Sequence, residues 1–417
     1  MPVSSALSSH YRQLLGLVKP WNISDIELNV ADPQVNIFLE WPNGKAVLCP
    51  ECKKRCTIFD RREERVWRHL DTMQFKTFLH CRIPRSNCPV HGTKTITVPW
   101  GEANSRWTLM FETFALIVLE QAPTITKAAN LLGLSWDQVL DLKKRAVKRG
   151  LKRRSVENIE HLGMDEKSFG RKERFITVLS DLDGGRVLDV APSKSKKAAK
   201  AVLEVIPEKQ RELIKAVAMD MAAAYEVVCK EMMKQADIVY DKFHIEQKLN
   251  KAVDKIRSAE HKFLLAQGIN TFTKTRWLWL RRPERWSEKQ EKQFRNVEAE
   301  FGAGKLAQTK IGRGWMIKEA FRPFWDYVYK GAANRYFRRW YYWATHSKLK
   351  PMIDVAKTIN EHLKGVLTYF DHGITNAFSE SINSKIQELK SGARGFRNFD
   401  NYRISILFSC GKLEMNP

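Results

Sequence analysis

Two short pairs of metal-binding residues constrain the first part of the chain more than any other feature of its sequence. Cys49 and Cys52 form a C-x-x-C pair, and Cys88 and His91 form a C-x-x-H pair further along. Structural zinc is held by four tetrahedral sulfur and nitrogen ligands, and a two-residue spacer lets one turn aim two ligands at the same ion. The spacing therefore predicts a structural Zn²⁺ in a zinc ribbon, in which a small antiparallel sheet joins the two turns.

Between the two pairs lie two strand-like stretches, residues 66–70 and 75–83, which we expect to form that sheet. Cys56 is an alternative ligand to Cys52, whose spacing fits a ligand turn better. Cys81 falls inside an alternating strand, where a buried free thiol is the simpler interpretation. The alternative for the whole cluster is a set of scattered reduced cysteines that bind no metal.

The charge balance indicates the class of partner. The chain has 71 Lys and Arg against 47 Asp and Glu, a formal net charge of +24. Such an excess favours a polyanion, because each neutralised phosphate releases counterions without any recognition of sequence. The hydrophobic share of 43% excludes global disorder, and 417 residues exceed one typical domain.

Several further features predict a cytoplasmic protein. The seven cysteines are odd in number and cluster early, which argues against a secreted disulfide framework. No window approaches about 18 uninterrupted apolar residues, so no membrane span is expected. Residues 1–20 lack the plan of a secretory signal. The sequence contains no GxxxxGK[ST] loop, so ATP is not predicted as a cofactor.

Residues 105–155 have the plan of a helix-turn-helix. The small Ala128 and Ala129 permit close helix crossing, Gly133 turns the chain, and Ser135 can cap a second helix. That second helix would lie in the major groove of DNA, and the alternative is an ordinary helical linker. The residues at its start that we expect to contact DNA are Ser135, Trp136 and Gln138.

A basic run follows directly, because residues 143–154 contain eight Lys or Arg and no acid. A run of this kind is a natural contact for DNA phosphates. The predicted contacts are Lys143, Lys144, Arg145, Lys148, Arg149, Lys152, Arg153 and Arg154.

The next segment is predicted to be an α/β domain whose strands end in acids. The expected elements are strands 161–166, 175–180 and 185–190, helix 195–205, strand 216–220, helix 225–233 and strand 238–241. This is the order of the ribonuclease-H-like fold, in which the first and fourth strands are neighbours at the centre of the sheet. Asp165 and Asp220 are therefore expected to face each other at the strand ends.

Paired carboxylates at that place suit the chemistry of a phosphodiester. The attacking oxygen must be activated and the leaving oxygen neutralised, which two divalent ions roughly 3.5–4 Å apart accomplish. Mg²⁺ needs carboxylate oxygens to hold it. A third candidate, Glu380, lies on the polar face of a predicted helix, beside Asn383. The alternative is that these acids are ordinary caps at element ends.

The chain resembles the transposases of bacterial insertion sequences in the ISL-three family, and the resemblance runs almost end to end. Beyond the two ligand pairs, it is carried by WRHLD at 67–71, GLSWD at 133–137, MDE at 164–166, AMDM at 218–221, DKFH at 241–244, TRWL at 275–278 and TNAFSESIN at 375–383.

The resemblance implies an activity and its residues. The Asp-Asp-Glu triad of the family maps onto Asp165, Asp220 and Glu380, with two Mg²⁺ (or Mn²⁺) ions at the catalytic site. It implies cutting at terminal inverted repeats and strand transfer into target DNA.

A second motif of related transposases, D/C-x-x-H after the second Asp, matches Asp241 and His244. The histidine would hold a scissile phosphate or orient a carboxylate, and Asn383 joins it as an auxiliary residue of the site. The alternative is an Asp-capped helix with a histidine whose hydrogen bonds are satisfied within the fold. Glu166 is expected on the opposite face of its strand rather than as a ligand.

About 135 residues separate the DKFH motif from the third acid, far more than the fold needs. We expect this surplus to be a helical insertion, since it holds seven of the 13 tryptophans. Trp277, next to Arg276, is the best candidate for stacking on unpaired bases, whereas core packing is the simpler role for most of the others.

The sequence thus predicts a multi-domain α+β chain. Its segments are an N-terminal region with the zinc ribbon (1–104), a helix-turn-helix (105–155), and a ribonuclease-H-like core (156–255 and 351–417) interrupted by a helical insertion (256–350). The predicted function is a metal-dependent DNA transposase that acts on double-stranded DNA as a homodimer or larger assembly, in the cytoplasm and at the nucleoid. The alternatives are a catalytically silent, sequence-specific DNA-binding protein and a plain metal-dependent nuclease.

Overall fold

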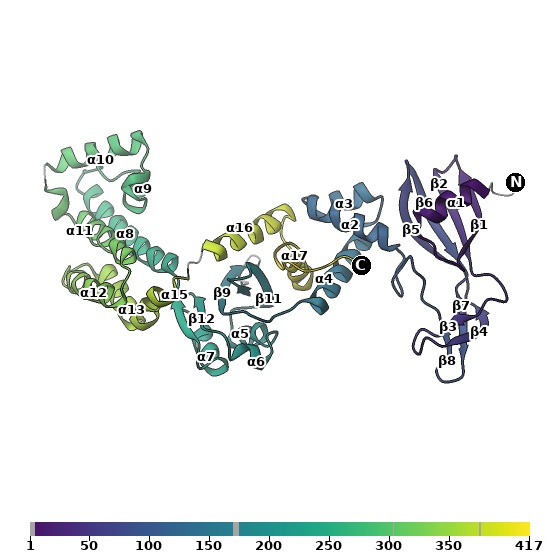
Figure 1. The fold of residues 1–417 in the computed structure, drawn as a ribbon. Coiled ribbons are helices and arrows are strands. Elements are labelled where there is room, and N and C mark those ends of the chain that lie inside the picture. The colour runs from purple at the N-terminus through teal and green to yellow at the C-terminus, as the bar shows by residue number, and fades with distance from the viewer. Residues whose placement is uncertain (1–4, 170–174, 303, 375–376) are drawn as a thin grey trace. The chain divides into compact units, whose positions relative to one another are not determined.

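The chain divides into two compact units (Figure 1). The computed structural model describes residues 5–169, 175–302, 304–374 and 377–417, without the side chains of Ser5 and of residues 377–380. Unit 1 contains Met1–Arg154 together with Leu413–Pro417, and unit 2 contains Ser155–Lys412. The backbone therefore passes between the units twice. None of the described helices is both long enough and apolar enough to cross a membrane.

Unit 1 begins with a sheet in the order β1-β2-β6-β5. Its elements are α1 (Ser5–Leu14), β1 (Asn22–Asn29), β2 (Gln34–Glu40), β5 (Arg65–Thr72) and β6 (Phe75–Cys81). Strands β2 and β6 pair in parallel, whereas the two outer pairs are antiparallel. Val35, Ile37 and Leu39 alternate with less buried residues along β2, so this face of the sheet packs into a core that contains Trp67 and Trp100.

A second sheet of unit 1, in the order β3-β4-β7-β8, contains the metal-ligand pairs. Its antiparallel strands are β3 (Val47–Leu48), β4 (Arg55–Arg61), β7 (Pro84–Cys88) and β8 (Gly92–Thr95). The prediction that residues 66–70 and 75–83 form this sheet is wrong, because they belong mainly to β5 and β6 of the first sheet. Alternation marks a strand with one buried face but does not specify the strand with which it pairs.

The helix-turn-helix plan of residues 105–155 is confirmed. Its helices are α2 (Leu109–Gln121), α3 (Ile125–Leu132) and α4 (Trp136–Arg153). The side chains of Thr108, Thr124 and Ser135 accept hydrogen bonds from backbone N–H groups in the first turns of these helices. Gly133 ends α3 with a φ of 62°, a left-handed conformation that favours glycine.

The last residues of the chain return to α4. Met415 is buried, and the guanidinium groups of Arg149 and Arg153 donate hydrogen bonds to the carbonyls of Met415 and Asn416. A Cβ added at Gly150 would lie 2.6 Å from the Cβ of Leu413, so the tail needs a glycine at this position.

Unit 2 is built on a mixed sheet in the order β11-β10-β9-β12-β13. Its strands are β9 (His161–Ser168), β10 (Phe175–Asp181), β11 (Arg186–Pro192), β12 (Ala216–Met219) and β13 (Asp237–Tyr240). Strands β9, β10 and β11 are antiparallel to their neighbours, whereas β12 runs parallel to both β9 and β13. The crossovers are α5 (Lys196–Leu203), α6 (Glu208–Arg211) and α7 (Ala223–Met232). The predicted strand order, including the adjacency of the first and fourth strands, is confirmed.

The rest of unit 2 is helical. Its α-helices are α8 (Lys242–Leu265), α9 (Arg276–Leu280), α10 (Glu288–Phe301), α11 (Lys310–Glu319), α12 (Lys330–Thr345), α13 (Lys350–Glu361), α14 (Leu363–Leu367), α15 (Tyr369–His372), α16 (Ala377–Gly392) and α17 (Phe399–Cys410), with short 3₁₀ turns at Pro283–Arg285, Leu306–Gln308 and Arg322–Asp326. One hydrophobic cluster runs from the sheet into these helices, and α8 passes without a break through the boundary predicted at residue 255.

Candidate functional site

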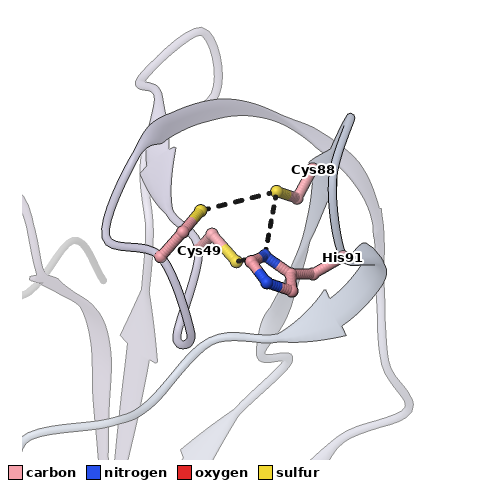
Figure 2. A group of neighbouring side chains, drawn as sticks. Cys49, Cys88 and His91 are labelled. Atoms are coloured by element: carbon pink, nitrogen blue, oxygen red, sulfur yellow. Dashed lines mark hydrogen bonds between the residues drawn. The ribbon is translucent and has the colours of Figure 1, made fainter.

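The metal-ligand side chains converge between the turns of the ribbon sheet. The ligand atoms of Cys49, Cys52, Cys88 and His91 all lie within 4.8 Å of one another. His91 Nδ1 is 3.7 Å from the Sγ atoms of both Cys49 and Cys88, and the Sγ atoms of Cys52 and Cys88 are also 3.7 Å apart. Figure 2 shows Cys49, Cys88 and His91 pointing toward one another.

These separations fit a tetrahedral zinc site. With Zn–S bonds of about 2.3 Å and Zn–N bonds of about 2.0–2.1 Å, neighbouring ligand atoms stand about 3.5–3.8 Å apart. Backbone donors also favour the thiolate form that zinc requires. The backbone N–H of His91 is the main cause that lowers the pKa of Cys88 to about 7, and that of Cys52 lowers the pKa of Cys49.

Glu51 and Lys94 form an outer layer around this cluster that the sequence analysis missed. Glu51 Oε2 lies 3.5 Å from His91 Nε2, and Glu51 Oε1 lies 2.8 Å from Lys94 Nζ. A carboxylate at Nε2 holds the ring in the tautomer that leaves Nδ1 directed at the thiols. The signal was present in the sequence, because Glu51 stands between the two cysteines of the first pair.

The two remaining cysteines of this region behave differently. Cys81 is 2% exposed at the end of β6, and burial raises its pKa to about 12, so the buried-thiol interpretation is confirmed. Cys56 is buried on β4 and its Sγ contacts the Lys54 carbonyl, outside the group of four ligand atoms.

In unit 2, two acids stand side by side on neighbouring strands, although the expectation that both lie at strand ends holds only for Asp220, because β9 continues to Ser168. Asp165 lies on β9, Asp220 directly follows β12, and the pairing of Met164 with Met219 places the two acids at the next position of this register. Each carboxylate accepts a hydrogen bond from the backbone N–H of the following residue, at 2.7 and 2.6 Å. Asp165 is 9% exposed.

His244, in the first turn of α8, brings these acids together with a third. Its Nδ1 is 3.5 Å from Asp220 Oδ2, and its Nε2 is 4.0 Å from Asp165 Oδ1 and 3.5 Å from Asp241 Oδ2. Asp241 also caps α8, because its Oδ1 accepts from the backbone N–H of Phe243 at 2.9 Å. The predicted capping role of Asp241 is confirmed, and the histidine faces the acids rather than a separate partner.

Asn383 reaches the same place from helix α16. Its Nδ2 donates to Asp165 Oδ2 at 2.6 Å, and Lys167 Nζ lies 3.9 Å from that oxygen. Glu380 lies one turn earlier on α16, and its side chain is outside the described residues. Glu166, the neighbour of Asp165, pairs instead with Lys194 at 3.5 Å.

The basic run on α4 divides into two faces. Lys144, Lys148 and Lys152 are exposed and stand four residues apart, so they share one face of the helix. Arg153 is exposed and Arg154 is half-buried. The exposed lysines are the part of the predicted phosphate contact that is open to solvent.

The other face of α4 points inward, and this corrects the predicted interface. Lys143 and Arg149 are 6% and 9% exposed, and Arg149 forms ion pairs with Glu112 and Glu102. Arg145 also pairs with Glu102, at 3.0 Å. These side chains lie among the apolar positions of an amphipathic helix, so they are committed to the interior of unit 1.

At the start of α4, two of the three side chains that were predicted to contact DNA cap the helix instead. Ser135 and Gln138 form a capping box, in which each side chain accepts from the backbone N–H of the other. Trp136 is 44% exposed.

The tryptophans of the helical region also separate into two classes. Trp279, Trp325 and Trp340 are buried in the hydrophobic cluster, as expected for most of them. Trp277 is 53% exposed, with the guanidinium carbons of Arg276 and Arg281 at 5.4 and 5.5 Å from its ring centroid.

Comparison with known protein families shows to which family the chain belongs. A family model described as a transposase of the ISL3 type matches residues 162–406, which is more than half of the chain. The zinc finger of transposases IS204, IS1001, IS1096 and IS1165 matches residues 45–91, and the helix-turn-helix domain of transposase family ISL3 matches residues 96–147. The chain belongs to the ISL3 transposase family.

Full-length relatives agree with this assignment. The transposase of insertion sequence element IS1001 from Bordetella parapertussis is 26% identical over 89% of this chain and 90% of its own length. The transposase of element IS1557 from Mycobacterium tuberculosis is 28% identical over 93% of this chain and 92% of its own length. The transposase therefore has a zinc-ribbon domain and DNA-binding domains in addition to its transposase domain.

Two acids that organise the helix-turn-helix of the transposase also escaped the sequence analysis. Glu102 pairs with Arg145 and Arg149, and Glu112 is fully buried against Arg149. The signal for Glu112 was its place one residue after the apolar run 109–111 at the start of α2, where a buried charge needs a partner. Glu102 lies in a loop, and its sequence context indicates no partner.

Proposed function

We propose that the chain is an Asp-Asp-Glu transposase that binds the terminal inverted repeats of its element, cuts DNA there and transfers the freed strand into target DNA. The observation that carries this proposal is the convergence of Asp165, Asp220 and His244, with Asn383, where β12 ends beside β9. Family membership supplies the reaction class, and this cluster supplies the residues.

The sheet supports assignment of unit 2 to the ribonuclease-H-like fold. Three antiparallel strands followed by two parallel strands, with the first and fourth strands adjacent, give the order of that fold. In this assignment the helices between α8 and α13 are an insertion into the core. We keep the five predicted segments as the domain organisation, with the start of the insertion moved beyond the end of α8.

The donor chemistry of the acidic cluster fits Mg²⁺ or Mn²⁺, because carboxylate oxygens are the ligands that hard divalent cations prefer. Asp165 and Asp220 would hold one ion and Glu380 a second. When bound, two such ions activate the attacking oxygen of a phosphodiester and neutralise the leaving oxygen. In the ribbon, Cys49, Cys52, Cys88 and His91 would hold Zn²⁺, which stabilises the fold.

The protein's own groups have positioning roles in this proposal. Asn383 fixes Oδ2 of Asp165 through a donated hydrogen bond, so it sets the direction of the remaining lone pairs. His244 lies between the acids, where its ring would orient the carboxylates or donate to a non-bridging phosphate oxygen. Asp241 holds that ring by capping α8 beside it.

DNA would be bound by the exposed face of α4. Lys144, Lys148 and Lys152 present three ammonium groups at helical spacing, and Trp136 stands at the start of the same helix. Arg276 and Trp277 remain the proposed stacking pair of the insertion, since the ring is open to solvent. We also propose that two or more copies assemble on DNA, because each terminal repeat needs its own binding unit.

The test is a cleavage assay with a labelled DNA fragment that carries the ends of the element. With Mg²⁺, we expect the parent protein to cut at the ends and to yield joined products with a target plasmid. Asp220→Asn removes one carboxylate, and we expect it to abolish cutting while end binding is retained. Glu166→Gln, an acid next to Asp165 that pairs with Lys194, is the matched control and should cut like the parent.

The outcomes separate the candidate functions. Unchanged cutting by Asp220→Asn refutes the triad assignment. A parent protein that binds the ends tightly and cuts nothing is a silent DNA-binding protein. Cutting without any joined product indicates a plain nuclease.

A further inference from the structure

Helix α12 has an unusual composition for a helix of the insertion. Its sequence, KGAANRYFRRWYYWAT, contains four basic and six aromatic residues and no acid. No Asp or Glu occurs anywhere between Asp326 and Asp354. Aromatic residues in a helix of this kind usually serve the core, so their placement around the helix axis decides what α12 does.

The structure divides the aromatic residues of α12 between two faces. Phe337 and Trp340 are buried in the hydrophobic cluster with Ala333 and Ala344, and this face packs the helix against the rest of unit 2. Figure 1 shows α12 packed beside α13. Packing in the hydrophobic core therefore accounts for only some of the six aromatic residues of α12.

The opposite face carries side chains that are exposed to solvent. It consists of Arg335, Arg339, Tyr342, Trp343 and His346, which we call the basic-aromatic face. At 100° per residue these positions lie on one side of the helix. Tyr342 is 65% exposed and Trp343 is 43% exposed. The rings of Tyr342 and His346 stack with centroids 4.0 Å apart.

The arginines of this face are uncommitted. Neither Arg335 nor Arg339 makes an ion pair or a side-chain hydrogen bond with any residue that the structure describes. The contrast within the same helix is Arg338, which donates to Asn360 Oδ1 at 3.1 Å. Two free guanidinium groups beside open rings form a surface whose natural complement is anionic and aromatic.

Charge disfavours a symmetric contact between two copies of the chain on this face. A symmetric contact would set arginine against arginine, and no acid on this face offers compensation. The net charge of +24 adds to that repulsion. A nucleic acid strand has the opposite sign, and its bases can stack on Trp343 and on the face of Tyr342 that His346 leaves open.

The rings also discriminate between forms of DNA. In a duplex the base faces are covered by their neighbours, so a duplex offers only phosphates to this surface. An unpaired strand offers phosphates to the arginines and bases to the rings at the same time.

We propose that the basic-aromatic face binds an unpaired segment of DNA strand, by stacking bases on Tyr342 and Trp343 and by pairing phosphates with Arg335 and Arg339. The proposal rests on the proposed function, because cutting at a DNA end exposes such a segment. It assigns to the insertion a binding site for single-stranded DNA that lies outside the acidic cluster.

The test measures the binding of labelled oligo-dT and of a duplex of equal length to the full-length protein by fluorescence anisotropy. The variant Tyr342→Leu/Trp343→Leu should weaken oligo-dT binding by roughly five-fold or more for each stacked base, and duplex binding by less than about two-fold. Phe263→Leu, which changes a 60% exposed ring on α8, is the matched control and should bind like the parent.

A second variant tests the phosphate contacts. Arg335→Gln/Arg339→Gln should reduce the slope of log affinity against log salt for oligo-dT by about 1.4, because each neutralised phosphate of a single strand contributes about 0.7. The control for charge is Lys289→Gln/Lys292→Gln on α10, where both lysines are exposed. Matching far-UV circular dichroism and thermal unfolding of all variants establishes that they are folded.

Three results would overturn the proposal. The first is oligo-dT binding by the aromatic variant that equals the parent's, and the second is an equal loss for oligo-dT and duplex. The third is a shift of the parent to a larger assembly in sedimentation that the aromatic variant abolishes, since the face would then be a protein interface. Asp220→Asn should bind oligo-dT normally, so a failure of the proposed cutting activity is distinguishable from a failure of this site.

Discussion

The buried lysine of helix α4 provides a test of which face of that helix meets DNA. Lys143 is 6% exposed, and burial lowers its pKa to about 8 from 10.5. Below pH 8 the folded and unfolded chains both carry this proton. Between about pH 8 and pH 10.5 only the unfolded chain does, so the folding stability rises with pH across that interval.

The structure sets the size of the effect. The interval from about 8 to 10.5, at about 1.36 kcal/mol for each pH unit, corresponds to about 3 kcal/mol. In Lys143→Met the charge is absent and the length of the side chain is nearly retained. We therefore expect the free energy of unfolding of the variant to exceed that of the parent by up to about 3 kcal/mol at neutral pH, and this gain to vanish as the pH approaches 10.5.

The assay is urea unfolding followed by circular dichroism, with parent and variant compared at each pH so that other titrating groups cancel. Lys144→Met, at the exposed neighbouring position, is the control and should show no such pH-dependent difference. DNA affinity should behave in the opposite way, falling for Lys144→Met with a salt slope smaller by about 0.9 and staying unchanged for Lys143→Met. A stability difference that is constant with pH, or a loss of DNA affinity in Lys143→Met, would refute the reasoning.

Three further predictions concern other parts of the chain. Cys88→Ser removes one zinc ligand, so metal analysis should find less than one zinc per chain and residues 45–95 should become sensitive to protease; a parent protein that lacks zinc would contradict this. Asn383→Leu deletes the hydrogen bond to the β9 carboxylate, and it should slow cutting of the element's ends roughly 10- to 100-fold without changing end binding, whereas unaltered cutting would remove this residue from the site. Gly150→Ala places a Cβ 2.6 Å from the Cβ of Leu413, so unfolding should become easier by about 1–3 kcal/mol and carboxypeptidase should trim the tail faster. Gly331→Ala, whose added Cβ meets nothing closer than 3.8 Å, should do neither.

Some parts of the fold were predictable because they depend on local chemistry. The helix-turn-helix follows from a capping serine, a glycine in the left-handed region and alanines at the crossing, all of which act within a few residues. The succession of strands and helices along unit 2 follows from short apolar runs that alternate with helical periodicity. The zinc ligands follow from spacing, since two residues of one turn must reach the same ion.

Other parts were not predictable because they depend on partners far along the chain. The alternation in residues 66–70 and 75–83 identified strands, but their assignment to the first sheet depends on β2, more than 25 residues earlier. Charge counting treated residues 143–154 as one solvated surface. The helical period contained the missing information, because Lys143 stands four residues after the buried Val139 and three before the buried Ala146.

At the acidic cluster, the sequence identified most of the members but not their arrangement. Asp165 and Asp220 came from predicted strand ends, whereas Asn383 was predicted as an auxiliary residue on a polar helix face, with no partner assigned to it. Its hydrogen bond to Asp165 spans 218 residues, a separation over which no local pattern carries information.

The return of Leu413–Pro417 to unit 1 has a consequence for how this family can be recombined. A chimera that takes residues 1–154 from one relative and the remainder from another would place a foreign tail against Gly150 and Arg149. The part of the protein that contains the zinc ribbon and the helix-turn-helix is therefore a two-segment module, and its last five residues are encoded downstream of residues 155–412. Specificity exchange between relatives requires that both segments be transplanted together.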